Sequence, residues 1–460
     1  MKRFVSLTAL LALIALTFTA CGGGSSSTSP SNPSTPQYQV FVTGEDAPIP
    51  SVISFYITIN SITVSNSSST VTLLSQPTTV DFGRLMGLRS LLGFNKVAAG
   101  TYTGATFSLA NPVIYYVDLT TTPPSVKSIN GTLTNSTVTV AFPNGSPLTV
   151  SGSGQAGLHM DFDLRQSLAV DGNGNITGSV NPTIDVSAVS ASSELGEITE
   201  FTGSVVSTNS TANTFTMQGP YGFQEVIDVS SVSPQTQFNG SYTLGSLPTN
   251  AIVSVVGTFQ ADGSIMASDV EVITTDKAFI SGRILAVAPG PAVTMFVGEE
   301  LPNMSPTIPI DTVYTVNLSP VTQYDVCFID NWLTGQFFNN STLVVGQRIF
   351  VGGTFQNETF SPDLVSLRRQ GILGSLVANS VNITSGNRGS FSMQNDLLMS
   401  YAAGGPFTVY TGDLTIFDNV NGLAGLQSAG AANLVTRGLV FEDLNTQKPI
   451  VVAGRVRVLP

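Results

Sequence analysis

The chain has 460 residues, with 17 basic and 29 acidic side chains and a formal net charge of −12. Charged residues make up 10% of it, far below the roughly 25% of ordinary soluble domains. An acidic chain without a basic cluster excludes nucleic acid as an expected partner, and it excludes electrostatic binding to anionic lipid. One histidine and two cysteines leave little material for catalytic or metal chemistry, and we expect no cofactor.

Residues 1–21 are typical of an export signal. Lys2 and Arg3 precede an apolar run over residues 5–16, and small residues then lead to Cys21. A run this short, with basic residues before it, indicates a cleavable signal rather than a membrane-spanning helix. The residues before Cys21 resemble the lipobox of bacterial lipoproteins, with Phe18 where that family usually has Leu. The alternative is an ordinary signal peptide followed by a chance cysteine.

The lipobox resemblance implies that Cys21 becomes the acylated first residue of the mature protein. Two or three acyl chains anchor a protein stably, so membrane contact is expected through these chains alone. Gly22 resembles the outer-membrane sorting pattern of that family. Residues 22–37 are Gly, Ser, Thr, Pro, Asn and Gln and predict a flexible linker. We therefore expect an exported, lipid-anchored protein of the cell envelope, held at the outer membrane.

Residues 38–190 predict a sandwich-like antiparallel β domain. Short segments rich in β-branched and aromatic residues alternate with Gly, Pro, Asn and Ser, which is the pattern of such domains. The clearest strand covers residues 52–59, and others follow at 62–64, 70–74, 101–109, 113–117, 132–140 and 148–150. One helix is predicted over Phe82–Phe94, because Leu85, Leu88, Leu91 and Leu92 have helical spacing.

Several motifs of this domain follow one another in a recognisable order: residues 43–48, Ile57-Thr58-Ile59, Val80-Asp81-Phe82, residues 98–103, Asp161-Phe162-Asp163 with Ser167, and Asn181-Pro182. This order resembles the bacterial lipoprotein family called domain of unknown function 4382. The resemblance covers most of residues 38–189. It implies a β-rich envelope domain and no particular activity.

An internal repeat occupies the remainder of the chain, and we predict three units over residues 197–273, 279–369 and 370–460. Gly203, Gly282 and Gly374 open corresponding motifs, and each is followed by a short segment that contains a methionine. The segments 236–238, 322–324 and 415–417 also align, as do 253–259 and 348–355. The spacing between the first glycines, 79 and 92 residues, indicates small tandem domains rather than solenoid turns.

Alternating apolar residues and glycines at strand corners favour small barrels, which leave few exposed strand edges. The motif order resembles the tandem repeat called domain of unknown function 5666, which implies an OB-like fold. The third unit, 370–460, matches least and is predicted to be a degenerate barrel. The sequence therefore predicts an all-β protein, with a sandwich-like domain followed by two to three small OB-like barrels.

His159, Asp161 and Asp163 share one face of a predicted strand, so the three side chains could hold a metal ion. Strand periodicity alone also produces this arrangement, and ordinary hydrogen-bonded polar residues are the simpler interpretation. Asp171, Asn173 and Asn175 place oxygen ligands at alternate positions, like the start of a calcium loop. No acidic residue follows at the spacing that an EF-hand requires, and Asp-Gly and Asn-Gly also suit a hairpin turn.

Trp332 is the only tryptophan, and it lies in an insertion of the second unit over residues 328–340. It could stack on a ligand, or its loop could pack on its own barrel. The second cysteine, Cys327, lies in an apolar run and is expected to be a buried, inert side chain.

The leading functional hypothesis is a non-enzymatic envelope protein that presents β domains for binding or structural roles. Its partner would be an unidentified envelope protein or a glycan. The alternative is an exported hydrolase, acting on glycans through carboxylates of the N-terminal domain. Two acids that converge in a cleft with aromatic walls would favour the hydrolase.

Overall fold

The computed structural model describes residues 36–47, 51–85, 88–118, 120–121, 124–152, 155–172, 175–219, 224–275, 278–290, 292–327 and 337–459. The signal segment 1–21 and nearly all of the linker 22–37 lie outside these residues. By its contacts, the chain divides into Met1–Pro36 and a compact unit, Gln37–Pro460. The compact unit is mostly β-structure, as the composition and spacing of the sequence predict. None of the helices in the described ranges has the length and apolar character needed to span a membrane.

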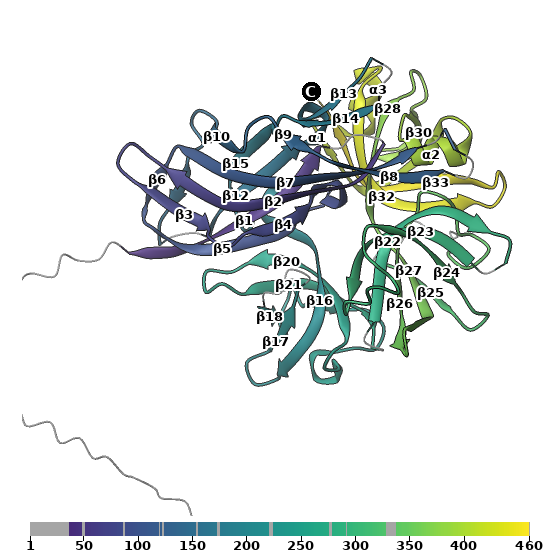
Figure 1. Ribbon diagram of the computed structural model, residues 1–460, viewed down its shortest axis with the longest axis horizontal. Coiled ribbons are helices and arrows are strands. Elements are labelled where there is room, and N and C mark those ends of the chain that lie inside the picture. The colour runs from purple at the N-terminus through teal and green to yellow at the C-terminus, as the bar shows by residue number, and fades with distance from the viewer. Residues whose placement is uncertain are drawn as a thin grey trace, which may run out of the picture. The chain divides into compact units, whose positions relative to one another are not determined.

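The N-terminal domain contains fifteen strands and two single-turn helices within the described residues (Figure 1). These elements are β1 (Gln37–Ala47), β2 (Val52–Ser65), β3 (Thr70–Leu74), β4 (Thr78–Asp81), η1 (Phe82–Leu85), β5 (Ser90–Ala98), β6 (Gly100–Tyr102), β7 (Gly104–Asp118), β8 (Ser125–Asn130), β9 (Thr132–Leu133), β10 (Thr137–Ala141), β11 (Leu148–Val150), β12 (Ala156–Asp163), α1 (Leu164–Ser167), β13 (Leu168–Val170), β14 (Ile176–Val180) and β15 (Ile184–Ser190).

Two sheets of this domain enclose its core. One has the order β15-β12-β1-β5, and the other has the order β10-β7-β2-β3 with β4 and β8 attached. Leu158, Met160 and Phe162 of β12 face the second sheet, where Phe162 lies 5.3 Å from the ring of Phe55. The sandwich-like fold is as predicted, but it is not wholly antiparallel, because β1 and β12 pair in parallel. Alternation along β12 sends the side chain of His159 to the opposite face of its sheet.

The predicted helix over Phe82–Phe94 is wrong. The chain makes one 3-10 turn, η1, and residues from Ser90 onward form β5, which pairs with β1. The leucines of this segment are buried on both faces of the strand: Leu92 joins the sandwich core, whereas Leu91 joins the core of the next module. A strand buried on both faces reads as a continuous apolar run, and its leucine spacing then resembles that of a helix.

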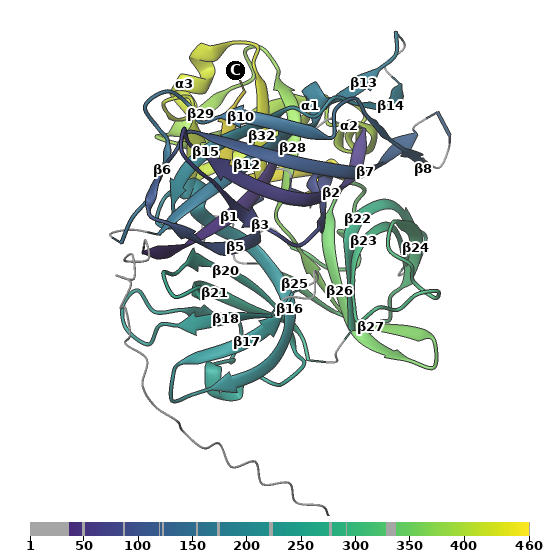
Figure 2. The same ribbon diagram turned by 60° about the vertical axis from the view of Figure 1, so that its left-hand side comes forward.

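Three six-stranded sheets follow, one for each predicted unit, and we call them the first, second and third repeats (Figure 2). After η2 (Glu194–Gly196), the first repeat contains β16 (Glu197–Asn209), β17 (Thr214–Gln218), β18 (Gln224–Val229), β19 (Gln237–Phe238), η3 (Leu244–Ser246), β20 (Ile252–Phe259) and β21 (Ile265–Thr274). The second contains β22 (Ala278–Ala288), β23 (Ala292–Leu301), β24 (Thr312–Asn317), β25 (Gln323–Val326), β26 (Arg348–Gln356) and β27 (Thr359–Leu367). The third contains β28 (Gln370–Leu376), β29 (Asn382–Ser385), β30 (Arg388–Gln394), α2 (Leu397–Ala403), β31 (Phe407–Asp418), α3 (Gly422–Ala429), β32 (Asn433–Asp443) and β33 (Lys448–Val458).

The first and third repeats share one pattern of strand pairing, which closes each sheet into a ring. In the first repeat, β18 pairs with β21 and completes the ring β18-β17-β16-β20-β21. In the third repeat, the ring is β28-β32-β33-β31-β30, closed by the pairing of β28 with β30. These are small OB-like barrels. The third repeat, which the sequence predicts to be degenerate, therefore has the same pairings as the first.

The second repeat has the same strand order, but its sheet stays open, because β24 does not pair with β27. A bulge at Gly257 sets Ala267 opposite it in the first repeat, and a bulge at Gly353 sets Pro362 opposite it in the second. Proline has no backbone N–H to donate to a neighbouring strand. In the second repeat, Pro362 therefore occupies the position that Ala267 has in the first repeat, where Ala267 pairs with β18 and closes the ring. Side chains of the third repeat join the core of this open sheet: Leu439, Phe441, Ile450 and Val452.

In each repeat, the aligned glycine lies against the aligned methionine, because two paired strands approach each other closely there. A Cβ on Gly282 would collide with the carbonyl oxygen of Phe296 on the paired strand and would press on the Met295 side chain. Gly203 and Gly374 meet equivalent carbonyl oxygens and methionines in their own repeats. Each glycine therefore lets two strands cross closely over a buried methionine, as expected for a tightly coiled small barrel.

We expect Gly282→Ala to lower the free energy of unfolding by roughly 2–4 kcal/mol, because the new methyl group has no room beside a backbone carbonyl. Gly298→Ala on β23, the strand paired with β22, is the matched control, because a Cβ there meets no atom within 4 Å. Urea denaturation of the two variants measures the difference. Equal stability of both variants would contradict the close approach of β22 and β23.

Candidate functional site

Many ion pairs of this charge-poor protein lie where its four modules meet. Among the described residues, six arginines form ion pairs with acids of a different module: Arg84, Arg89, Arg283, Arg348, Arg368 and Arg457. We call this set of contacts the arginine layer. A buried guanidinium group is costly unless it is paired, so these contacts constrain how the modules fit together.

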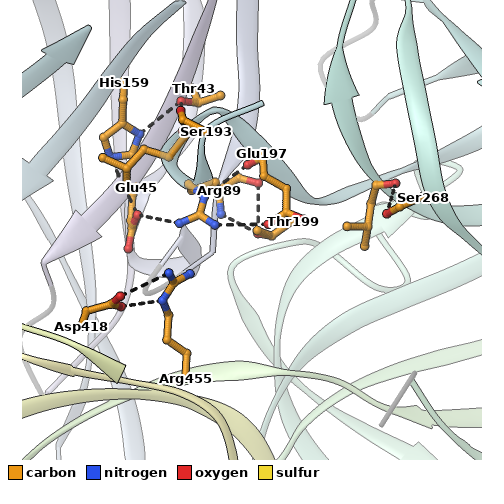
Figure 3. A network of polar contacts seen from close by, with 12 residues as sticks. Thr43, Glu45, Arg89, His159, Ser193, Glu197, Thr199, Ser268, Asp418 and Arg455 are labelled. Carbon is orange, nitrogen blue, oxygen red and sulfur yellow. Dashed lines mark hydrogen bonds and ion pairs between the residues drawn. The ribbon is translucent and has the colours of Figure 1, made fainter. Parts of the chain in front are cut away.

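One cluster of the arginine layer surrounds Glu45 on β1, which is 3% exposed (Figure 3). Its carboxylate lies 3.7 Å from a guanidinium nitrogen of Arg89 and 3.8 Å from Nε2 of His159. Its other oxygen lies 3.2 Å from Arg457, near the end of the chain. Arg457 in turn lies 3.8 Å from Asp418, which Arg455 also contacts. Glu45 thus joins the N-terminal domain to the third repeat.

Arg89 fastens the N-terminal domain to the first repeat. Its backbone N–H donates to Oγ1 of Thr199 at 2.7 Å, and the N–H of Thr199 donates to its carbonyl oxygen at 3.0 Å. Its Nε donates to the carbonyl oxygen of Glu197 at 3.2 Å. Beside these contacts, Phe259 of the first repeat packs on Phe41, with ring centroids 5.3 Å apart. The first repeat therefore covers the outer face of β1 and β5 with both apolar and polar contacts.

A second cluster joins the first repeat to the second. Glu200 forms a bidentate pair with Arg348, at 2.9 and 2.5 Å, and Arg368 lies 3.7 Å from it. Arg368 also binds Glu271, and both arginines lie over the ring of Phe350, at 5.1 and 4.3 Å from its centroid. Burial alone would raise the pKa of Glu200, but the charges of Arg348 and Arg368 hold it at about 2.

The predicted metal candidates of β12 lie on one face, as the strand period requires, and two of them have hydrogen-bond partners of their own. Nδ1 of His159 lies 3.1 Å from Oγ1 of Thr43, and burial lowers its pKa to about 4, so the ring is neutral at pH 7. Asp163 caps α1 by accepting the N–H of Gln166. Burial and the charge of Glu45 raise the pKa of Asp161 to about 7. Over the described ranges, no three His, Cys, Asp or Glu side chains group as a metal ion would need.

The remaining predicted sites are partly outside the described residues. Asn173 and Trp332 lie outside them, as does Cys21. Asp171 accepts the backbone N–H of Asn175 at 2.9 Å and its side-chain amide at 3.0 Å, so its carboxylate closes the turn between β13 and β14. Cys327 is buried at the end of β25, and burial raises the pKa of its thiol.

A groove of about 730 Å³ lies between the first and second repeats. Its walls come from equivalent strands of the two repeats, β19 and β25, and from the strands β21 and β27 that pair with them. Phe238, Tyr242 and Tyr324 supply aromatic lining, Asp325 supplies an exposed carboxylate, and no Lys or Arg of the described residues lines it. Aromatic surface with a few polar groups is typical of ligand sites, and an acidic lining disfavours anions.

Neither the arginine layer nor the groove was predicted from the sequence. The layer had a signal: most basic residues after position 80 are arginine, and several alternate with apolar residues, as in Arg455-Val456-Arg457. The groove had a signal in Phe238 and Tyr324, which are aligned residues of the two repeats and both line it.

The fold and its contacts define a modular β protein, and comparison with known families adds one finding. Residues 39–177 match the family model described as Domain of unknown function (DUF4382). This match confirms the resemblance of the N-terminal domain. It covers less than half of the chain, and the likeness of the repeats to domain of unknown function 5666 stays a prediction. A search of curated proteins found no match to the chain.

We expect Arg348→Met to destabilise the protein by about 3–5 kcal/mol, because Glu200 then stays buried without its strongest partner. The double variant Arg348→Met with Glu200→Leu should recover most of this loss, since neither charge remains. Arg388→Met is the control: its ion pair with Asp413 is more than half exposed, and the change should cost less than about 1 kcal/mol. Chemical denaturation of the wild type, the two single variants and the double variant measures the loss and its recovery. Equal losses in the single and double variants would contradict it.

Asp161 should make stability depend on pH. Its pKa rises from 3.8 to about 7 on folding, so the folded protein holds an extra proton between these values. The stability from this proton is present below pH 4 and is lost as the pH rises to about 7. Asp161→Asn removes the loss, and the variant should be more stable than the wild type at pH 8 but not at pH 4. Urea midpoints at both pH values measure this, with the exposed Asp325→Asn as control.

Proposed function

We propose that the protein is a lipid-anchored protein of the cell envelope, whose four β modules present one binding surface and perform no catalysis. The observation that supports this best is that its ionisable side chains are engaged in ion pairs within and between the modules. The ionisable groups that could serve chemistry, such as His159, Glu45 and Arg89, contact one another within the N-terminal domain. Arg89 and Glu45 also pair with Glu197 of the first repeat and Arg457 of the third. They fix modules in place, and the exposed groove between the first two repeats then offers the binding surface.

The composition of the groove supports an uncharged or cationic partner. Its exposed side chains include Gln323 and Asp325, and the partly buried rings of Phe238, Tyr242 and Tyr324 lie beside them. Tyrosine and phenylalanine provide flat apolar area, and amide and carboxylate groups accept or donate hydrogen bonds in fixed directions. A neutral glycan or a segment of another envelope protein has matching chemistry. The anchor and linker predicted from the sequence would hold this surface near a membrane.

The anchor is tested by growing the source bacterium, or an expressing host with lipoprotein processing, with an alkyne fatty acid. The wild-type protein should carry the label and sediment with membranes, and Cys21→Ser should be unlabelled and released. Cys327→Ser is the control and should stay labelled. Label retained in Cys21→Ser, or an unlabelled wild type, would contradict lipid anchoring.

The groove is tested with a photo-crosslinking residue at Gln323 in intact cells. A defined adduct, protein or glycan, should form there and weaken when Asp325 is changed to Lys. A crosslinker at Gln224, exposed on β18 and away from the groove lining, is the control. Identical adducts at both positions, or none at the groove, would contradict its use as the binding surface.

The alternative function is a glycan hydrolase that uses carboxylates of the N-terminal domain. One observation favours it: Glu45 and Asp161 are opposite each other on paired strands, and burial gives Asp161 a pKa of about 7, as a general acid needs. Release of reducing sugar from envelope polysaccharides by the wild type, lost in Asp161→Asn, would establish it. Equal release by both proteins, or none, would leave the carboxylates with a structural role.

A further inference from the structure

A small cavity of about 30 Å³ lies at the point where all four modules meet. Leu88 of the N-terminal domain lines it, together with Thr199, Glu200 and Glu271 of the first repeat. Cys327, Arg368 and Arg369 enter from the second repeat, and Arg437 enters from the third. A cavity of this size holds one or two water-sized species and excludes phosphate and larger anions.

The two buried acids of this cavity are already matched by cations. Glu200 has its bidentate pair with Arg348, and Glu271 accepts from Arg368 and from the hydroxyl of Ser366. Asp269, which also lines the cavity, accepts the hydroxyl of Ser268 at 2.8 Å (Figure 3 shows Ser268). Two of the three carboxylates that line the cavity are therefore paired with arginines.

Arg437 is the arginine of this cavity whose side chain has no acidic partner among the described residues. Its side chain makes no ion pair or hydrogen bond with any described residue, and its Nε is buried without a partner. The Nε of Arg368, a residue 4% exposed, is likewise buried without a partner. Burial and the like charges of Arg369 and Arg89 lower the pKa of Arg437 to about 10, so the group stays charged at pH 7. Arg437 is partly exposed, but its buried Nε lacks an acceptor, and an anion beside the guanidinium group would supply one.

We propose that this cavity binds one small monovalent anion with the size and charge of chloride, held by the guanidinium groups of Arg437 and Arg368. The ion would be shared by side chains of two modules, the second and third repeats, so it would stabilise their association in addition to the direct ion pairs. A ligand that binds only the folded protein raises its unfolding temperature with concentration. The proposal goes beyond the binding function above and does not depend on it.

The test compares thermal unfolding of the full chain in sodium chloride and in sodium gluconate at equal ionic strength. Gluconate screens surface charge equally but is too large for the cavity. We expect the unfolding temperature to rise by several degrees with chloride over gluconate in the wild type and in the control Arg388→Met. Arg437→Met should lose this difference. The same response to both salts in the wild type, or a chloride response that survives in Arg437→Met, would overturn the proposal.

Crystals grown in sodium bromide give a second measurement that does not require a folded variant. Bromide replaces chloride in such sites and scatters anomalously, so a peak beside Arg437 is expected. A cavity without an anomalous peak at the same bromide concentration would show that it holds water, and would overturn the proposal even if Arg437→Met fails to fold.

Discussion

Removing a guanidinium group from water is tolerated only when acids and carbonyl oxygens replace the lost hydration, and this constraint governs how the four modules fit together. Arg348 meets this constraint most fully, because Glu200, the carbonyl oxygen of Arg369 and the ring of Phe350 surround its side chain. Such pairs add little net stability compared with an apolar contact of the same shape. They do penalise every other docking of the modules, because any shift leaves a charge buried and unmatched. The arginine layer therefore explains a single arrangement better than it explains stability.

The local features of the fold could be predicted from the sequence, because short-range physics determines them. Alternating β-branched residues predict the strands, and Gly203, Gly282 and Gly374 mark three equivalent close crossings, each over a methionine. These signals lie within a few residues of the structures that they specify. The resemblance of the N-terminal domain rests on motifs of the same local kind, and the family match over residues 39–177 confirms it.

The candidate site could not be predicted, because its partners are distant in the sequence. Glu45 and Arg457 are 412 positions apart, and Arg368 meets Glu271 across two repeats. The helix expected around Leu91 failed for a related reason: the segment is buried on both faces, one against its own sandwich and one against the first repeat. Spacing within a segment shows how many faces are apolar, but the neighbouring module decides what those faces require. Pro362 could be predicted only in part. Its missing N–H is evident from the sequence, but the strand with which its position would pair is not.

The arginine layer and the groove are connected through one residue. Glu271 lines the groove on one side and the four-module cavity on the other, and it binds Arg368 between them. The two groove walls belong to different repeats, so their separation is set by the contacts behind them and not by either repeat alone. We therefore expect a change of charge at the cavity to alter the groove through the position of Glu271 and β21. This link gives the protein a physical reason to spend its few charged side chains in the interior, where they fix the geometry of a surface made of largely uncharged residues.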